Sequence, residues 1–270
     1  MKNKLKGFTL VELLVTITII AVLTGVGYSV TRSLREKAKM VVEVNAARNL
    51  IAGYLGHAAE HNGQVLIGNA SKPNDVTNLD GVAVYGVEAE RYPWRLAPSV
   101  PSVRGTLFFN GNEKTLDEDL GGYKATLRPN LGLNSTLVGG YFGSGSAPIK
   151  PSPRIVETYG KFYVSQLSDS DDPGGLIVFA SARDGEKQTG YYQVWPPKAT
   201  GAVWSTGDFK ASEPSASFGF VDFRWGGKAV TARLGGNVEL NTVDELRDMR
   251  HWSHQAARAN DPNFTITSSR

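Results

Sequence analysis

The sequence contains no cysteine among its 270 residues. Disulfide bonds, zinc–thiolate sites, iron–sulfur clusters and thiol nucleophiles are therefore excluded, although a chain without cysteine can fold in either redox compartment. Hydrophobic residues make up 41% of the chain and charged residues 20%, which is typical of a folded protein. The length allows a substantial apolar core, in one large domain or two small ones, without covalent cross-links.

The chain also has almost no net charge, because it contains 29 Lys and Arg residues and 26 Asp and Glu residues. The surplus of three lies at one end of the chain, where Lys2, Lys4 and Lys6 all precede the first acid, Glu12. A basic face for nucleic acid needs cations gathered over a folded surface. We therefore expect no nucleic-acid partner.

A long apolar run follows these lysines, and residues 13–30 carry no charge at all. A helix of about 20 residues crosses the hydrocarbon layer of a bilayer, and residues 8–30 are long enough for this. A cleaved secretory signal and an unprocessed single-span anchor are the alternatives. The secretory signal is disfavoured because no clear small-x-small cleavage site precedes the first polar residues after the run. An acid, Glu12, also lies inside it, where an ionised carboxylate normally has a partner.

Residues 7–14, with the sequence GFTLVELL, resemble the prepilin signature of type IV pilins and of the pseudopilins of type II secretion systems. The resemblance implies that prepilin peptidase cuts between Gly7 and Phe8 and that the new amino group of Phe8 is methylated. It also implies that Glu12 pairs with the N-terminal amine of a neighbouring subunit, which would neutralise both charges and fix the axial register.

The same resemblance implies a location and a set of partners. The expected location is the bacterial inner membrane, with a single span, the soluble domain in the periplasm, and a filament after assembly. Besides prepilin peptidase, the expected partners are other pilin or pseudopilin subunits, the inner-membrane assembly machinery and an exported protein cargo.

The fold class that we predict is α+β, with one long N-terminal helix packed on a β-rich domain and a short helix at the C-terminus. The predicted divisions are a leader at 1–7, a transmembrane and filament-core helix at 8–30, its amphipathic continuation at 31–62, a β-rich soluble domain at 63–241, and a C-terminal helix and tail at 242–270.

The amphipathic part of the long helix shows apolar residues at spacings of three and four, which predicts one buried stripe facing a sheet. Its members are Met40, Val44, Ala47, Ile51, Tyr54, Leu55 and Ala58, and we place Lys39, Glu43 and Arg48 on the opposite, polar face. Asn62 and Gly63 are expected to end the helix near His61.

Short β-rich runs follow Gly63. The predicted strands are 82–87, 106–109, 161–166, 176–180 and 191–195, and the strongest predicted hairpin joins 218–225 to 228–234 through Gly226-Gly227. Residues 98–101, 143–153 and 168–175 are expected to be loops.

Residues 225–238 also resemble a motif near the end of a group of large bacterial pilin-like proteins, in which a His precedes nine residues and an Asp-Gly pair. Here Trp225 stands in the His position and Gly235 in the Asp position, so no polar role is carried over and the segment is predicted to be a β-hairpin. Thr242 and Glu245 then form a capping box, which predicts a helix through about Ala259. Its predicted apolar stripe consists of Leu246, Met249, Trp252 and Ala256.

Three sets of residues suggest other chemistry. His57, Glu60 and His61 fit the H-x-x-E-H pattern of an inverted zinc peptidase, although the solvated end of a helix explains them as well. Asp169, Asp171 and Asp172 resemble the opening of a calcium loop, but Pro173 occupies a ligand position and no Glu closes the site. We therefore expect no cofactor and a plain acidic turn at these residues, with a calcium site as the alternative. The aromatic residues Tyr92, Trp94, Trp195 and Trp204 form either a binding surface or part of the core.

These observations predict a structural protein rather than an enzyme, since no G-x-S-x-G motif or other catalytic constellation is present. The predicted function is a subunit of a type II secretion pseudopilus or a type IV pilus-like filament. The alternatives are a minor pilin for adhesion or DNA uptake, and a membrane-anchored metallopeptidase that uses His57, Glu60 and His61.

Overall fold

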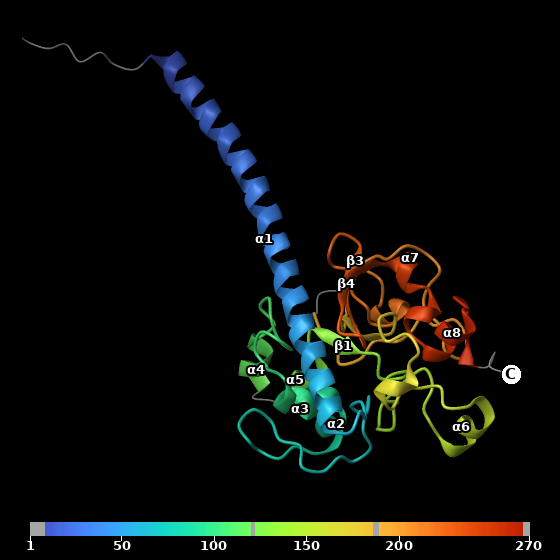
Figure 1. The fold of residues 1–270 in the computed structure, drawn as a ribbon. Helices are drawn as coiled ribbons and strands as arrows, with labels where there is room; N and C mark the ends of the chain where they lie inside the picture. The colour runs from blue at the N-terminus through green and yellow to red at the C-terminus, as the bar shows by residue number, and fades with distance from the viewer. Residues whose placement is uncertain (1–8, 120–121, 186–188, 267–270) are drawn as a thin grey trace, which may run out of the picture. The chain divides into compact units, whose positions relative to one another are not determined.

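The computed structural model describes residues 9–119, 122–185 and 189–266 (Figure 1). Residues 1–41 and 42–270 form two compact units, which we describe separately. A long N-terminal helix, a four-stranded antiparallel sheet and a short C-terminal helix make up an α+β fold, as the sequence predicts.

The first element, α1 (Leu10–Glu60), is one uninterrupted helix of 51 residues. It contains no proline, and beyond residue 31 it is rich in Ala, Leu, Arg, Lys and Glu, which are good helix formers. It ends where Asn62 and Gly63 take left-handed backbone angles, with φ of 55° and 81°. The N–H of Gly63 then bonds to the carbonyl of Ala58 at 2.7 Å, which confirms the predicted C-terminal cap.

The sheet has the strand order β1-β2-β3-β4, with every neighbouring pair antiparallel. Its strands are β1 (Leu131–Leu133), β2 (Ile177–Ser181), β3 (Lys228–Arg233) and β4 (Val238–Thr242). Every residue of β2 is buried, and a register irregularity between Ile177 and Phe179 interrupts its pairing with β3. The sheet is therefore covered on both faces.

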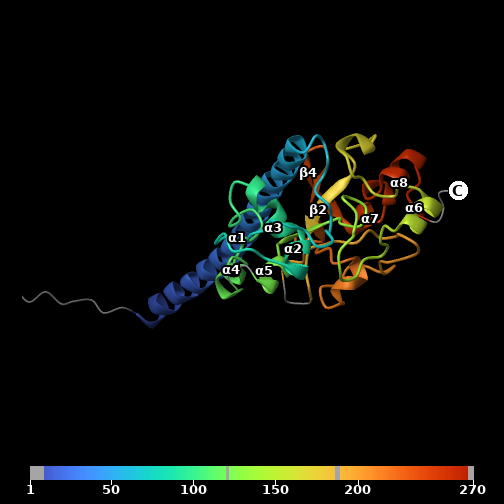
Figure 2. The ribbon, with the colours of Figure 1, turned by 90° about the horizontal axis from the view of Figure 1, so that it is seen from below.

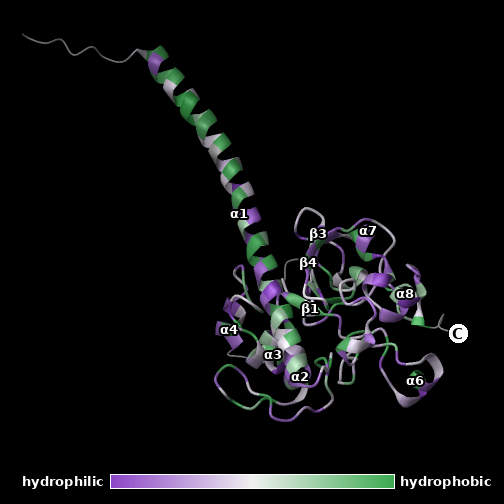
Figure 3. Ribbon diagram, viewed as in Figure 1, coloured by the Kyte–Doolittle hydropathy of each residue, from purple (hydrophilic) through white to green (hydrophobic). Residues whose placement is uncertain are grey.

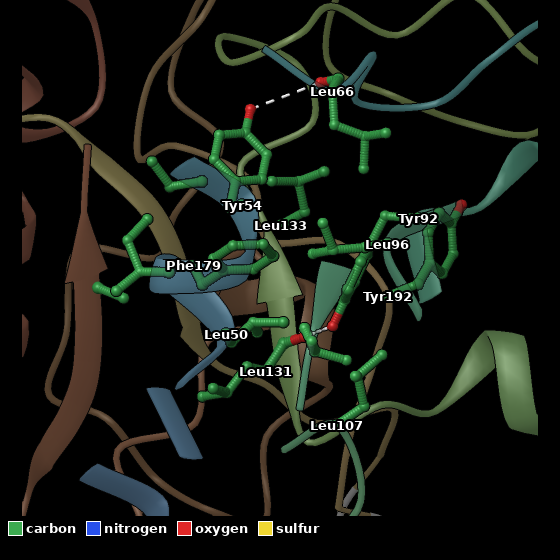
Figure 4. Close-up of a cluster of buried hydrophobic side chains, with 14 of the residues drawn as sticks. Leu50, Tyr54, Leu66, Tyr92, Leu96, Leu107, Leu131, Leu133, Phe179 and Tyr192 are labelled. Carbon is green, nitrogen blue, oxygen red and sulfur yellow. Dashed lines mark hydrogen bonds between the residues drawn. The ribbon is translucent and has the colours of Figure 1, made fainter. Parts of the chain in front are cut away.

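One face of the sheet packs on the last turns of α1. Leu50 and Tyr54 are fully buried, and the ring of Tyr54 meets Phe179 of β2 edge-on at 5.5 Å between centroids. Tyr92 closes the same cluster by donating a hydrogen bond to the carbonyl of Leu131 at 2.6 Å. Figure 4 shows these side chains converging from α1, the sheet and the segment around Tyr92. The predicted contact between the helix stripe and a sheet is thus confirmed.

Short helices surround this core. They are α2 (Gly86–Glu90), α3 (Tyr92–Leu96), α4 (Lys114–Asp119), α5 (Tyr123–Leu127) and α6 (Pro153–Tyr159), with the 3-10 turns η1 (Ala97–Ser99), η2 (Leu167–Asp169) and η3 (Ser215–Phe218). In both ribbon views, α2, α3 and α5 lie close to one another, on the opposite side of the domain from the C-terminal end of the chain (Figure 2). The second core cluster gathers the residues of the other sheet face with Leu246, Met249 and Trp252.

Two predicted strands are wrong. Residues 82–87 run into α2, because Gly86 adopts a φ of 61° and turns the chain into a helix. Residues 106–109 form turns in which Phe108 makes a single isolated bridge, and Gly105 at their start has a φ of 84°. The predicted strands at 161–166 and 191–195 are likewise reduced to isolated bridges, whereas 176–180 coincides with β2.

The predicted late hairpin is half correct. Trp225 and Lys228 exchange backbone hydrogen bonds of 3.1 and 3.2 Å across Gly226-Gly227, so the tight turn is real. Residues 218–225 are not a strand, because Gly219 and Phe220 both have positive φ. The hairpin instead joins β3 to β4, and its turn contains Gly235 and Gly236. This agrees with the hairpin expected over residues 225–238.

The predicted C-terminal helix is broken into three pieces, α7 (Val243–Leu246), η4 (Met249–His251) and α8 (His254–Ala259). The capping box at its start is confirmed. New caps interrupt it, since the Asp248 side chain accepts from the N–H of Arg250 and Ser253 accepts from that of Ala256. The predicted apolar residues Leu246, Met249, Trp252 and Ala256 are all completely buried.

Candidate functional site

The N-terminal end of α1 forms a capping box between Thr9 and Glu12. The N–H and the hydroxyl of Thr9 both donate to Oε2 of Glu12, at 2.9 and 2.8 Å, and the N–H of Glu12 donates to the Thr9 hydroxyl at 3.2 Å. The Glu12 carboxylate is therefore held back over the start of the helix. Gly7 and Phe8, the predicted cleavage and methylation positions, lie outside the described residues.

The next two turns satisfy their polar groups locally. The hydroxyls of Thr16 and Thr18 donate to the carbonyls of Leu13 and Leu14, both at 2.8 Å. Such back-bonding removes the main obstacle to placing a hydroxyl in hydrocarbon, where an unpaired donor costs several kcal/mol. Apart from Glu12, the surface of this part of the helix is therefore compatible with an apolar environment.

The first half of α1 is apolar and exposed. Every residue of positions 9–39 whose burial is described is exposed, including large apolar side chains such as Leu10 at 82% and Ile20 at 61%. Among the described residues, α1 is long and apolar enough to span a membrane. Figure 3 shows the hydrophobic colouring concentrated along this part of α1.

A polar groove follows the apolar stretch on the same helix. It is lined by Thr24, Tyr28, Thr31, Arg32, Arg35, Glu36 and Lys39. Lys39 and Glu36 form an ion pair at 3.4 Å, with both side chains about half exposed. The helix therefore changes from apolar to mainly basic within two turns of Thr24.

The His57, Glu60 and His61 set does not form a metal centre in the described part of the chain. The two imidazole rings stack with centroids 4.1 Å apart, and Nδ1 of His61 lies 2.7 Å from the carbonyl of His57. Burial lowers the pKa of His57, and the nearby His61 and Arg95 lower it further. The described part of the chain contains no group of three or more His, Asp or Glu side chains that could hold a metal ion.

The three aspartates of the calcium candidate turn to different partners. Asp169 pairs with Lys161 and Asp171 with Arg258, each at 2.8 Å, while Asp172 accepts from the N–H of Gly175. Burial alone raises the pKa of Asp169, but the bonds from Lys161 and from two backbone N–H groups lower it to about 2. The carboxylates thus act as ion-pair and turn partners rather than converging on one point.

The four aromatic residues do not form a binding surface. Tyr92 and Trp94 are buried in the cluster around α1, and Trp204 is 7% exposed in the second cluster. Trp195 is half-buried, with its ring 4.9 Å from that of Phe220. The core interpretation of these residues is therefore confirmed.

Glu43 was placed on the polar face of the helix, and this prediction is wrong, because the side chain is completely buried. Its Oε1 accepts a short hydrogen bond from the Ser181 hydroxyl, and its Oε2 lies 3.8 Å from Nη1 of Arg224. Burial raises the pKa of Glu43, although Arg224 and Ser181 oppose this effect.

A signal for Glu43 was present in the sequence. Its distances of four, seven and eleven residues from Ala47, Leu50 and Tyr54 put all four on one helical face. The prediction that Glu43 lies on the polar face uses residue type alone, because an unpaired carboxylate usually lies in solvent. The other two predicted polar residues, Lys39 and Arg48, are exposed as expected.

Comparisons with known proteins bear on the N-terminal segment. Residues 2–28 match the family model described as the prokaryotic N-terminal methylation motif, and this range includes Gly7, Phe8 and Glu12. No curated protein and no solved structure matches the chain. The family with this signature is structural rather than enzymatic, and the motif implies processing by prepilin peptidase and assembly with other pilin subunits. The N-terminal segment of the chain therefore carries the type IV pilin and pseudopilin signature.

Proposed function

We propose that this chain is a structural subunit of a type II secretion pseudopilus or a type IV pilus-like filament, assembled through residues 8–30. The observation that carries the proposal is the exposed apolar surface of α1 from Leu10 to Val30, which contains a single acid, Glu12, in its first turn. Such a surface is stable only in a bilayer or against other apolar helices. The bilayer would cover this surface before assembly, and the packed helices of the filament core would cover it afterwards.

Processing would prepare the chain to move from the bilayer into the filament. Prepilin peptidase would cut between Gly7 and Phe8, and methylation would follow on Phe8. The leader would take Lys2, Lys4 and Lys6 with it, so that 26 basic residues would remain against 26 acidic ones. The soluble domain would then lie in the periplasm, where the inner-membrane assembly machinery and exported cargo are its proposed further partners.

Glu12 would supply the register between subunits. Both bonds from Thr9 use Oε2 of the carboxylate, so Oε1 can accept a further donor. An amino group of a neighbouring subunit is the appropriate donor, because its positive charge would compensate the carboxylate in an apolar environment. The capping box would hold the carboxylate in position before the neighbour arrives.

Replacing Glu12 with Ala tests this proposal. We expect Glu12→Ala to abolish incorporation into filaments, measured by shearing cells and probing the filament fraction, because the register pair cannot form. Glu36→Ala is the matched control, since it removes an acid from the same helix beyond the apolar stretch and should leave assembly intact. All five tryptophans lie within residues 42–270, so their fluorescence checks that the domain remains folded. Normal assembly of a folded Glu12→Ala variant would contradict the proposal.

A further inference from the structure

A basic face follows the apolar stretch of α1. Tyr28, Arg32, Arg35 and Lys39 succeed one another at spacings of four, three and four, and together they line one groove along the helix. At about 100° per residue these spacings return to the same side of the helix. Lys37 lies almost half a turn away, on the side that also carries Leu34 and Val41. The helix is therefore amphipathic here, with its cations arranged by position and not merely abundant.

The charge of the helical segment that carries this face is strongly unbalanced. Between Leu13 and Val42 the only acid is Glu36, whereas Arg32, Arg35, Lys37 and Lys39 are all basic. Glu36 forms its ion pair with Lys39 at 3.4 Å, so the acid lies nearest the water-side end of the face. Arg32 and Arg35 thus form the part of the face that is closest to the apolar stretch.

The position of the two arginines along the helix matches the depth of lipid headgroups. Residues 10–30 span about 30 Å at 1.5 Å per residue, which equals the thickness of the hydrocarbon layer. The headgroup layer adds roughly 5–8 Å on each side, and Arg32 and Arg35 lie about 3 and 8 Å beyond Val30. Tyr28 lies just inside the boundary, where aromatic rings with a polar tip are favoured.

We propose that this basic face, Tyr28, Arg32, Arg35 and Lys39, binds the headgroups of anionic phospholipids while the subunit is in the membrane. The inference rests on the proposed function, because it requires that α1 spans a bilayer. A guanidinium offers paired donors that match the oxygens of a phosphate, and such charge-assisted bonds are stronger than neutral ones. The tyrosine hydroxyl adds a donor at the level of the lipid glycerol region.

A second copy of this helix is a poorer partner for the face. The same segment of another subunit carries four cations and one acid, so bringing two copies together here would place like charges close to each other. An anionic bilayer supplies phosphates at the required depth. Binding would hold the subunit at a fixed depth and would oppose its extraction from the membrane.

The test uses the full-length protein in non-ionic detergent, titrated with phosphatidylglycerol or with zwitterionic phosphatidylcholine and followed by native mass spectrometry. We expect the protein to bind phosphatidylglycerol more tightly. Arg35→Gln should weaken that binding about fivefold, the effect expected for one cation near an anionic surface. Lys37→Gln, which removes one charge from the opposite side, is the matched control and should leave the affinity unchanged. Arg35→Lys should retain most of the binding.

Three results would overturn the inference. The first is the absence of any preference for phosphatidylglycerol over phosphatidylcholine. The second is an equal loss of phosphatidylglycerol affinity in Arg35→Gln and Lys37→Gln. The third is unchanged lipid binding by Arg35→Gln together with reduced cross-linking between copies of the protein. The last result would assign the face to a protein partner. Alkaline carbonate extraction from phosphatidylcholine vesicles separates the two proposals. Release of the protein would contradict the membrane anchor itself, whereas retention without lipid preference would contradict only the inference drawn here.

Discussion

Glu43 shows how one acid can connect a helix to a sheet. It lies in α1, whereas its partners Ser181 and Arg224 belong to β2 and to the segment before β3. The Ser181 hydroxyl accepts from the N–H of Val230 at 2.8 Å, so the network also joins β2 to β3. Arg224 is shared, because its Nε lies 3.1 Å from Asp222. The arrangement fixes the rotation of the end of α1 on the sheet through a carboxylate and a hydroxyl that are completely buried.

Removing this carboxylate should destabilise the domain strongly. We expect Glu43→Ala to lower the free energy of unfolding by about 3 kcal/mol, because it leaves buried partners unsatisfied. Glu36→Ala on the same helix breaks only a surface pair and should change it by less than about 1 kcal/mol. Guanidinium unfolding of the full-length protein in detergent, followed by tryptophan fluorescence, measures both values. Equal values for the two variants would show that Glu43 has no special structural role.

The pH dependence of stability provides a second test of the same residue. Burial raises the pKa of Glu43 above its ordinary value of 4.5, whereas the unfolded chain keeps the ordinary value. Between these two pKa values the folded state binds a proton that the unfolded chain has released. The contribution of Glu43 to the free energy of unfolding should therefore rise as the pH falls through the folded pKa towards 4.5. Glu43→Gln should lack this contribution, and identical pH profiles would contradict the raised pKa.

At the scale of the element, the part of α1 that belongs to the second unit contains two glycines, Gly53 and Gly56, which differ in what surrounds them. A Cβ atom on Gly53 would lie 2.6 Å from the carbonyl oxygen of Ser99 and 2.7 Å from Cγ1 of Val100. A Cβ atom on Gly56 would meet nothing within 4 Å. Gly53 therefore allows the segment after α3 to approach the helix closely, whereas Gly56 has no such contact.

The two alanine substitutions should act in opposite directions. Gly56→Ala should raise the free energy of unfolding by about 0.5–1 kcal/mol, because alanine restricts the unfolded chain and favours the helix. Gly53→Ala should lower it by about 1–3 kcal/mol through overpacking. The same fluorescence measurement applies, and each variant is the control for the other. A gain in stability from Gly53→Ala would mean that the close approach is not required.

The sequence predicts elements well where the signal is local and repeated. The long helix, its apolar stripe, its cap and the strand β2 follow from spacing and composition. The strand predictions failed where one residue reverses the backbone, as at Gly86, Gly105 and Phe220. Neither the residues nor their spacing show in advance which glycine or aromatic residue takes a positive φ, because tertiary packing selects it.

The functional residues can likewise be predicted where the signal is local in the sequence, and not where the partners are far apart. The prepilin signature is contiguous, so Gly7, Phe8 and Glu12 could be named from the sequence, and the methylation motif matches the range that contains them. The capping box of Thr9 and Glu12 is also local, with both residues within one turn. Glu43 could not be paired from the sequence, because Ser181 is 138 positions away. The spacing places Glu43 on the buried face of the helix, but only the folded chain shows which groups it contacts.

At the scale of the whole molecule, the chain combines two units with different requirements. Residues 42–270 bury two apolar clusters around a sheet, whereas the described part of the first unit exposes an apolar helix. An exposed apolar helix of this kind needs a membrane or a filament to cover it. Under the proposed function, residues 1–7 are removed and the apolar segment is kept.

The intact mass of the protein extracted from membranes tests this claim most directly. We expect a mass that corresponds to residues 8–270 plus one methyl group, and a fragment spectrum that places the methyl group on the amine of Phe8. A mass that corresponds to loss of the whole apolar segment would contradict the account, because the chain would then be a secreted protein with an ordinary signal peptide.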